Sequence, residues 1–65
     1  MSYAEAKQIA LLRLELRSCW DSADYAGASV ALASLRAISA GPGNDNGELA
    51  AEVKRWAFRL DVMAA

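Results

Sequence analysis

The chain has 65 residues, of which 55% are hydrophobic, and its 7 basic and 8 acidic side chains give a net charge of −1. A chain of this length forms one small domain whose core is only marginally stabilising. The absence of histidine removes the commonest general base and metal ligand. The lone Cys19 excludes an internal disulfide and a cysteine-based zinc site. We therefore expect no enzyme, no metal, no cofactor and no small-molecule substrate.

The first residues, MSYAEAKQ, lack the basic and then apolar pattern of a signal peptide. The uncharged run over 25–35 is too short to span a bilayer. We expect a cytoplasmic protein with no membrane contact.

The first predicted element is a helix over residues 3–20. Its large apolar residues recur at helical spacing on one face, namely Ile9, Leu12, Leu16, Cys19 and Trp20. Leu11 and Leu14 fall on a different face of the same helix, together with Tyr3 and Ala10.

The second predicted helix covers residues 22–40, after a turn near 21–23. Its apolar row is offset by roughly 100° from that of the first helix, so one straight helix would direct its halves at different neighbours. Asp21 and Asp24 are good N-caps, and we interpret them as capping residues rather than metal ligands. Because no stretch alternates apolar and polar residues like a strand, the predicted fold class is all-α.

The stretch SADYAGASVALASLRAIS resembles the second half of a tetratricopeptide hairpin, whose turn commonly reads Gly-Asp-Tyr. Residues 23–25 read Ala-Asp-Tyr, and Ala28, Leu32 and Leu35 match the small and apolar positions. The resemblance covers residues 12–40 and departs at Leu12, where the family has Trp. Since repeat arrays need about three hairpins, we interpret the match as hairpin geometry. It implies a protein-binding scaffold.

The loop over 41–45 is predicted from GPGNDNG, in which Gly41 suits a helix end and Pro42 cannot continue a helix. The third predicted helix covers 46–64. Asp45 is its expected cap, with Asn46 as the alternative. The predicted architecture is a helical hairpin plus a third helix, completed by oligomerisation.

The predicted core consists of the large apolar residues that share one face of each helix: Ile9, Leu12, Leu16, Trp20, Leu32, Leu35, Ile38, Leu49, Val53, Trp56 and Leu60. Tyr25 and Ala28 are predicted on the same row of the second helix. Each helix also carries a second apolar face, and helices apolar on two sides predict a surface covered by another protein.

These second faces predict the partner-binding residues: Leu11 and Leu14 on the first helix, with Arg55, Phe58, Arg59 and Val62 on the third. We expect a non-enzymatic module, such as an adaptor, a co-chaperone or an inhibitor of the phage or antitoxin type, that binds another protein, itself as a homodimer, or both. Two alternatives stay open. One is a DNA-binding regulator that uses Lys54, Arg55 and Arg59, although nucleic-acid binding is disfavoured by the net charge; the other is a structural subunit of a larger assembly.

Overall fold

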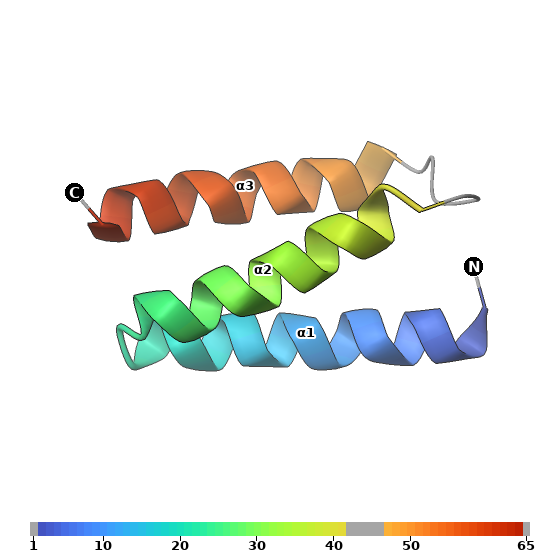
Figure 1. Ribbon diagram of the computed structural model, residues 1–65, viewed down its shortest axis with the longest axis horizontal. Helices are drawn as coiled ribbons and strands as arrows, with labels where there is room; N and C mark the ends of the chain where they lie inside the picture. Colours follow the sequence, from blue (N-terminus) through green and yellow to red (C-terminus); the bar gives the residue numbers. More distant parts are fainter. Residues whose placement is uncertain (1, 42–46, 65) are drawn as a thin grey trace.

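The computed structural model describes residues 2–41 and 47–64, and these form three helices and no strand (Figure 1). The helices are α1 (Tyr3–Asp21), α2 (Tyr25–Ser39) and α3 (Gly47–Ala64). The chain reverses direction between successive helices, so α2 lies between α1 and α3 and runs antiparallel to both. Within the described ranges, no Cα atom of α1 lies within 8 Å of one in α3. The predicted all-α domain of a hairpin and a third helix is confirmed.

The reversal between α1 and α2 is a tight turn closed by two backbone hydrogen bonds. The N–H of Asp24 donates to the carbonyl of Cys19 at 2.8 Å, and the N–H of Ala23 donates to that of Trp20 at 3.2 Å. This pair of bonds is the Schellman arrangement that closes a helix C-terminus. Ala23 has a φ of 57°, a left-handed conformation in which glycine is usual because a Cβ crowds the next carbonyl.

The start of α2 depends on Asp24 and Gly27. The Asp24 Oδ1 accepts a hydrogen bond from the backbone N–H of Gly27 at 3.0 Å, which caps the helix. A Cβ at position 27 would collide with this carboxylate and would lie 3.0 Å from the Cys19 Sγ. The missing side chain therefore lets the first turn of α2 pack closely against the last turn of α1.

The start of α1 and the end of α2 are also capped locally. The Ser2 hydroxyl accepts a backbone hydrogen bond from the first turn of α1 at 3.2 Å. Gly41 directly follows the C-cap Ala40, as predicted, and its N–H donates to a carbonyl of the last turn of α2 at 3.1 Å. The predicted caps of the third helix, Asp45 and Asn46, lie outside the described residues.

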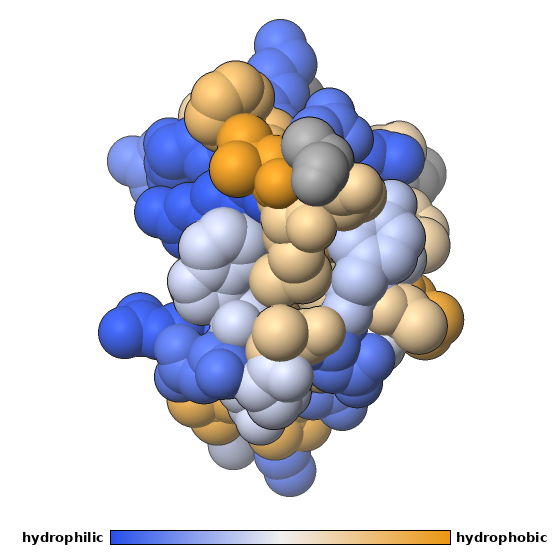
Figure 2. Space-filling model, turned by 90° about the vertical axis from the view of Figure 1, so that its left-hand side faces the viewer, coloured by the Kyte–Doolittle hydropathy of each residue, from blue (hydrophilic) through white to orange (hydrophobic). Residues whose placement is uncertain are grey.

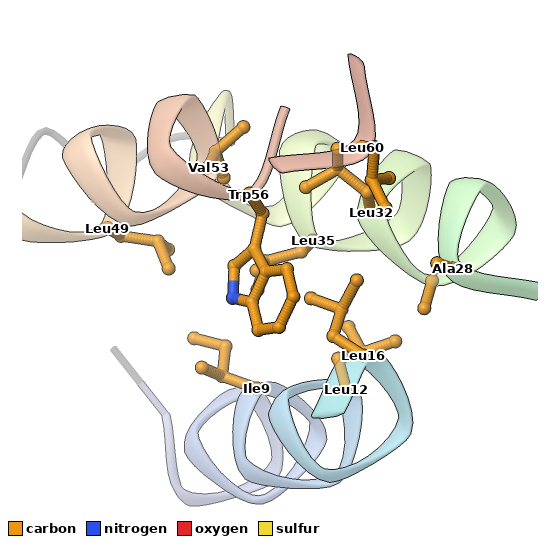
Figure 3. Close-up of a cluster of buried hydrophobic side chains, with 11 residues drawn as sticks. Ile9, Leu12, Leu16, Ala28, Leu32, Leu35, Leu49, Val53, Trp56 and Leu60 are labelled. Atoms are coloured by element: carbon orange, nitrogen blue, oxygen red, sulfur yellow. The ribbon is translucent and has the colours of Figure 1, made fainter. Parts of the chain in front are cut away.

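The hydrophobic core takes side chains from all three helices: Ile9, Leu12, Leu16, Ala28, Ala31, Leu32, Leu35, Leu49, Val53, Trp56 and Leu60. Leu16 and Leu35 are completely buried. In Figure 3 the indole of Trp56 projects from α3 toward Ile9, Leu12 and Leu16 of α1. This one large side chain fills the space between two helices whose backbones do not approach each other.

Three residues that the periodicity placed on buried faces are less buried than predicted. Trp20 is 36% exposed and Tyr25 is 46% exposed, while Ile38 is only partly buried against the core. Trp20 occupies the last turn of α1 and Tyr25 the first position of α2. Helical periodicity assigns a direction to a side chain, but near a helix end there is less neighbouring structure to cover it.

The boundaries also differ around the first turn. Helix α1 continues through Asp21, and α2 begins at Tyr25 instead of residue 22. The interpretation of Asp21 as a cap of α2 is therefore wrong; its carboxylate lies 3.8 Å from the Arg17 guanidinium, one turn earlier. Closure of the Schellman turn delays the start of α2 and leaves Asp24 as the capping residue.

Candidate protein-binding surfaces

Four of the six predicted partner-binding residues lie together on the outer side of α3. We define the α3 face as Lys54, Arg55, Phe58, Arg59 and Val62. Phe58 is 69% exposed and Val62 is 58% exposed. At about 100° per residue, Phe58 points roughly 170° away from the row that α3 buries in the core. The fold therefore holds the α3 face toward solvent by using the opposite side of the helix for packing.

The cations of the α3 face surround its aromatic residue. Lys54, Arg55 and Arg59 line a shallow depression with Phe58. The guanidinium carbon of Arg59 also lies 4.8 Å from the ring centre of Trp56, a distance at which a cation is attracted to an aromatic ring. This contact links the exposed surface to the core tryptophan.

A salt bridge connects α1 to α3 beside this surface. The Arg13 Nε donates to Glu52 Oε2 at 2.8 Å, and its Nη2 donates to Oε1 at 2.7 Å. This hydrogen bonding, together with the negative charge of Glu52, raises the pKa of Arg13 above its ordinary value despite an opposing effect of burial. Because the Arg13 side chain is half exposed, with a relative exposure of 53%, the bridge contributes little to the stability of the fold.

The other two predicted residues, Leu11 and Leu14, are exposed on α1, at 53% and 68% respectively. Leu14 lies roughly 170° around the helix from its buried row. Because that row faces the Trp56 ring of α3 (Figure 3), Leu14 points away from α3. The predicted residues therefore form two separate surfaces, and the structure does not join them into one site.

Sequence reasoning missed the partly exposed aromatic residues near the α1–α2 turn. Figure 2 looks at this end of the molecule and shows apolar and weakly polar surface between strongly hydrophilic flanks. Trp20 meets Trp56 edge-on, with ring centres 6.2 Å apart, while Tyr25 lines a depression between α2 and α3. The closeness of both residues to the turn was the available signal for their exposure.

Cys19 lies on the side of α1 that faces the start of α2. It is half-buried, and its Sγ lies 4.0 Å from the Asp24 Oδ2. Burial raises the pKa of the Cys19 thiol above its ordinary value, and the negative charges of Asp24 and Glu15 raise it further. A thiol with a raised pKa is a poor nucleophile at neutral pH, since the thiolate is the reactive form.

The described residues hold no cluster of three or more histidine, cysteine, aspartate or glutamate side chains arranged for a metal. None of the described helices is both long and apolar enough to cross a membrane. Comparison with family models, curated proteins and solved structures finds no match to this chain. The resemblance of residues 12–40 to a tetratricopeptide hairpin accordingly stays a prediction.

Proposed function

We propose that this chain is a small, non-enzymatic module that binds another protein through its exposed helix faces. The observation that carries the proposal is the exposure of Phe58 next to Val62, one turn apart on α3, with fractions of 69% and 58%. Aromatic and arginine side chains are enriched among the residues that dominate protein interfaces. The α3 face has both kinds of residue, and none of its five side chains belongs to the buried core.

Other exposed apolar residues support the same proposal. Tyr3, Leu14 and Val30 are each more than two-thirds exposed. Single exposed apolar residues are ordinary on protein surfaces. Here, however, they occur on each of the three helices of a very small domain, and a monomeric bundle normally places charged residues on its outer faces.

Self-association is the second part of the proposal. Copies of the chain would cover the uncharged outer side of α2, which includes Ala26, Val30, Ala33 and Ala37. As the protein concentration rises, the mass of a homodimer reaches a plateau at two chains, whereas the mass of a structural subunit of a larger assembly continues to grow. Sedimentation velocity separates these cases.

A DNA-binding regulator that uses Lys54, Arg55 and Arg59 has weaker support. These cations are exposed on α3, but the chain as a whole carries a net charge of −1, and an apolar row lies between them. A filter-binding assay with duplex DNA at low salt tests this alternative directly, because phosphate binding is strongest there.

Affinity capture from a lysate of the source cell tests the proposed function. The tagged wild type is compared with Phe58→Asp and with Gln8→Asp, a control in which an exposed residue outside the proposed surfaces changes on α1. Leu14→Asp tests the separate surface of α1. Circular dichroism of each variant first confirms that its helices are retained.

We expect the wild type and Gln8→Asp to retain the same protein and Phe58→Asp to lose it. Loss only with Leu14→Asp would move the binding surface to α1 while keeping the proposed class of function. If the wild type retains nothing beyond an empty matrix, and sedimentation shows a monomer, the proposal of an interaction module is wrong.

A further inference from the structure

The α3 face has an ordered arrangement of apolar and basic residues. Phe58 and Val62 form an apolar row along the helix, because residues four apart lie one above the other. On a helical wheel, Lys54 falls on one side of this row, and Arg55 and Arg59 fall on the other. A ligand that lies along the row would therefore meet a positive charge at both of its edges.

Two acidic residues of α3, Glu48 and Glu52, line a depression together with Arg55. Glu52 is directed toward α1, where it forms the salt bridge across the two helices. Asp61 lines the depression between α2 and α3, and Glu48 lies in the first turn. The depression around Phe58 itself is lined by Lys54, Arg55 and Arg59 and by no described carboxylate.

Arg59 is already partly positioned in the unbound chain. Its guanidinium lies over the Trp56 ring at 4.8 Å, and Trp56 is itself buried, with 8% exposed. A side chain that is held in place before binding loses less conformational entropy on forming an interface. Arg59 can therefore donate hydrogen bonds to a carboxylate without a large rearrangement.

We propose that the α3 face binds an amphipathic helix of another protein that carries Asp or Glu residues on both sides of an apolar row. This inference rests on the proposed function and specifies the chemistry of the partner. The apolar row of such a helix would cover Phe58 and Val62, and its carboxylates would pair with Lys54 on one edge and with Arg55 and Arg59 on the other. Such complementary charge fixes the register of two helices and speeds their encounter.

Charge disfavours the other occupants of this face. In a symmetric dimer the same surface meets its own copy, so the α3 faces of two chains would place cations against cations. Only three basic side chains are available for a nucleic acid or an anionic membrane. With roughly one phosphate neutralised per cation, binding to DNA would be weak at moderate salt.

A selection from a peptide library tests the proposal without assuming a partner. Helical peptides with a constant apolar row and randomised flanking positions are displayed and selected on immobilised wild type. Peptides that also bind Phe58→Asp are removed. The second bait is the double variant Lys54→Glu/Arg55→Glu, which changes two exposed residues and leaves the Arg59–Trp56 contact in place.

We expect peptides selected on the wild type to be enriched in Asp and Glu at the flanking positions. Their affinity, measured by fluorescence anisotropy, should fall at least tenfold on the double variant and also weaken as salt screens the charges. Replacing their acidic residues with Lys should restore binding to the double variant. Circular dichroism of the double variant must match that of the wild type.

Enrichment of neutral or basic peptides would overturn this inference, and so would the absence of any enrichment. Binding that is lost with Phe58→Asp but unchanged in the double variant would also overturn it, while the proposed function would stand. The inference is wrong, too, if the α3 face is occupied instead by a second copy, by duplex DNA or by vesicles of anionic phospholipid. Failure of the proposed function is read separately, from the lysate capture.

Discussion

The left-handed residue in the α1–α2 turn predicts that Ala23→Gly stabilises the protein. Ala23 has a φ of 57°, and this conformation costs an L-residue with a Cβ about 1.5 kcal/mol. Glycine removes that cost but loses about 0.7 kcal/mol through the greater freedom of the unfolded chain. The net gain of about 0.8 kcal/mol corresponds to a rise in Tm of about 5 °C for a domain of this size.

Thermal and urea unfolding, followed by circular dichroism at a helical wavelength, measure this effect. The control is Ala10→Gly, which changes an exposed residue inside α1 and should destabilise the fold by about 1 kcal/mol. The urea m-value should not change, since both variants expose the same surface on unfolding. If Ala23→Gly lowered the Tm as much as the control, residue 23 would be helical, and the turn that separates α1 from α2 would be wrong.

Three further predictions follow from local contacts. Gly27→Ala should destabilise the fold by about 1 kcal/mol despite the better helix propensity of alanine, because the new Cβ displaces the Asp24 carboxylate that caps α2. The control Gly47→Ala, at a position with open space around it, should not destabilise the fold. Chemical denaturation compares the two variants. Glu52→Gln should cost about 0.5 kcal/mol at low salt and less at high salt, because it weakens the exposed bridge to α1; an equal loss at both salt concentrations would contradict the electrostatic explanation. The raised pKa of the Cys19 thiol predicts slow alkylation at neutral pH, with a rate that keeps increasing beyond the pH at which an ordinary thiol levels off. The stability that the protonated Cys19 thiol contributes to the folded state is fully present below the ordinary thiol pKa and is lost as the pH rises through the folded-state pKa. If the alkylation rate of the folded chain varied with pH in the same way as that of the urea-unfolded chain, the raised pKa would be refuted.

Most of the helical pattern was predictable because it depends on short-range chemistry. The end of α2 near Gly41 follows from a glycine and a proline in sequence, and both act on the local backbone. The buried rows of α1 and α3 follow from apolar residues at helical spacing. Phe58 was placed on an outer face by the same periodicity, and the structure leaves it exposed.

The turn and its neighbours were less predictable because several local signals compete there. Asp21, Ser22 and Asp24 all have the chemistry of N-caps. The backbone bonds that close α1 select Asp24, and this choice moves the start of α2 to Tyr25. A sequence pattern ranks such residues by propensity, whereas the structure requires all the hydrogen bonds of the turn to form together.

The sequence by itself determined the all-α class, the approximate helices and the composition of each helix face, since these depend on residues within a few turns of one another. Only the tertiary structure decided how α1 and α3 are connected: Trp56 fills the space between them, and Arg13 reaches Glu52 across 39 positions of the chain. It also separated the α3 face from the exposed leucines of α1. The reason is that the relative rotation of packed helices depends on how their side chains fill the shared core, and periodicity within one helix carries no information about that fit.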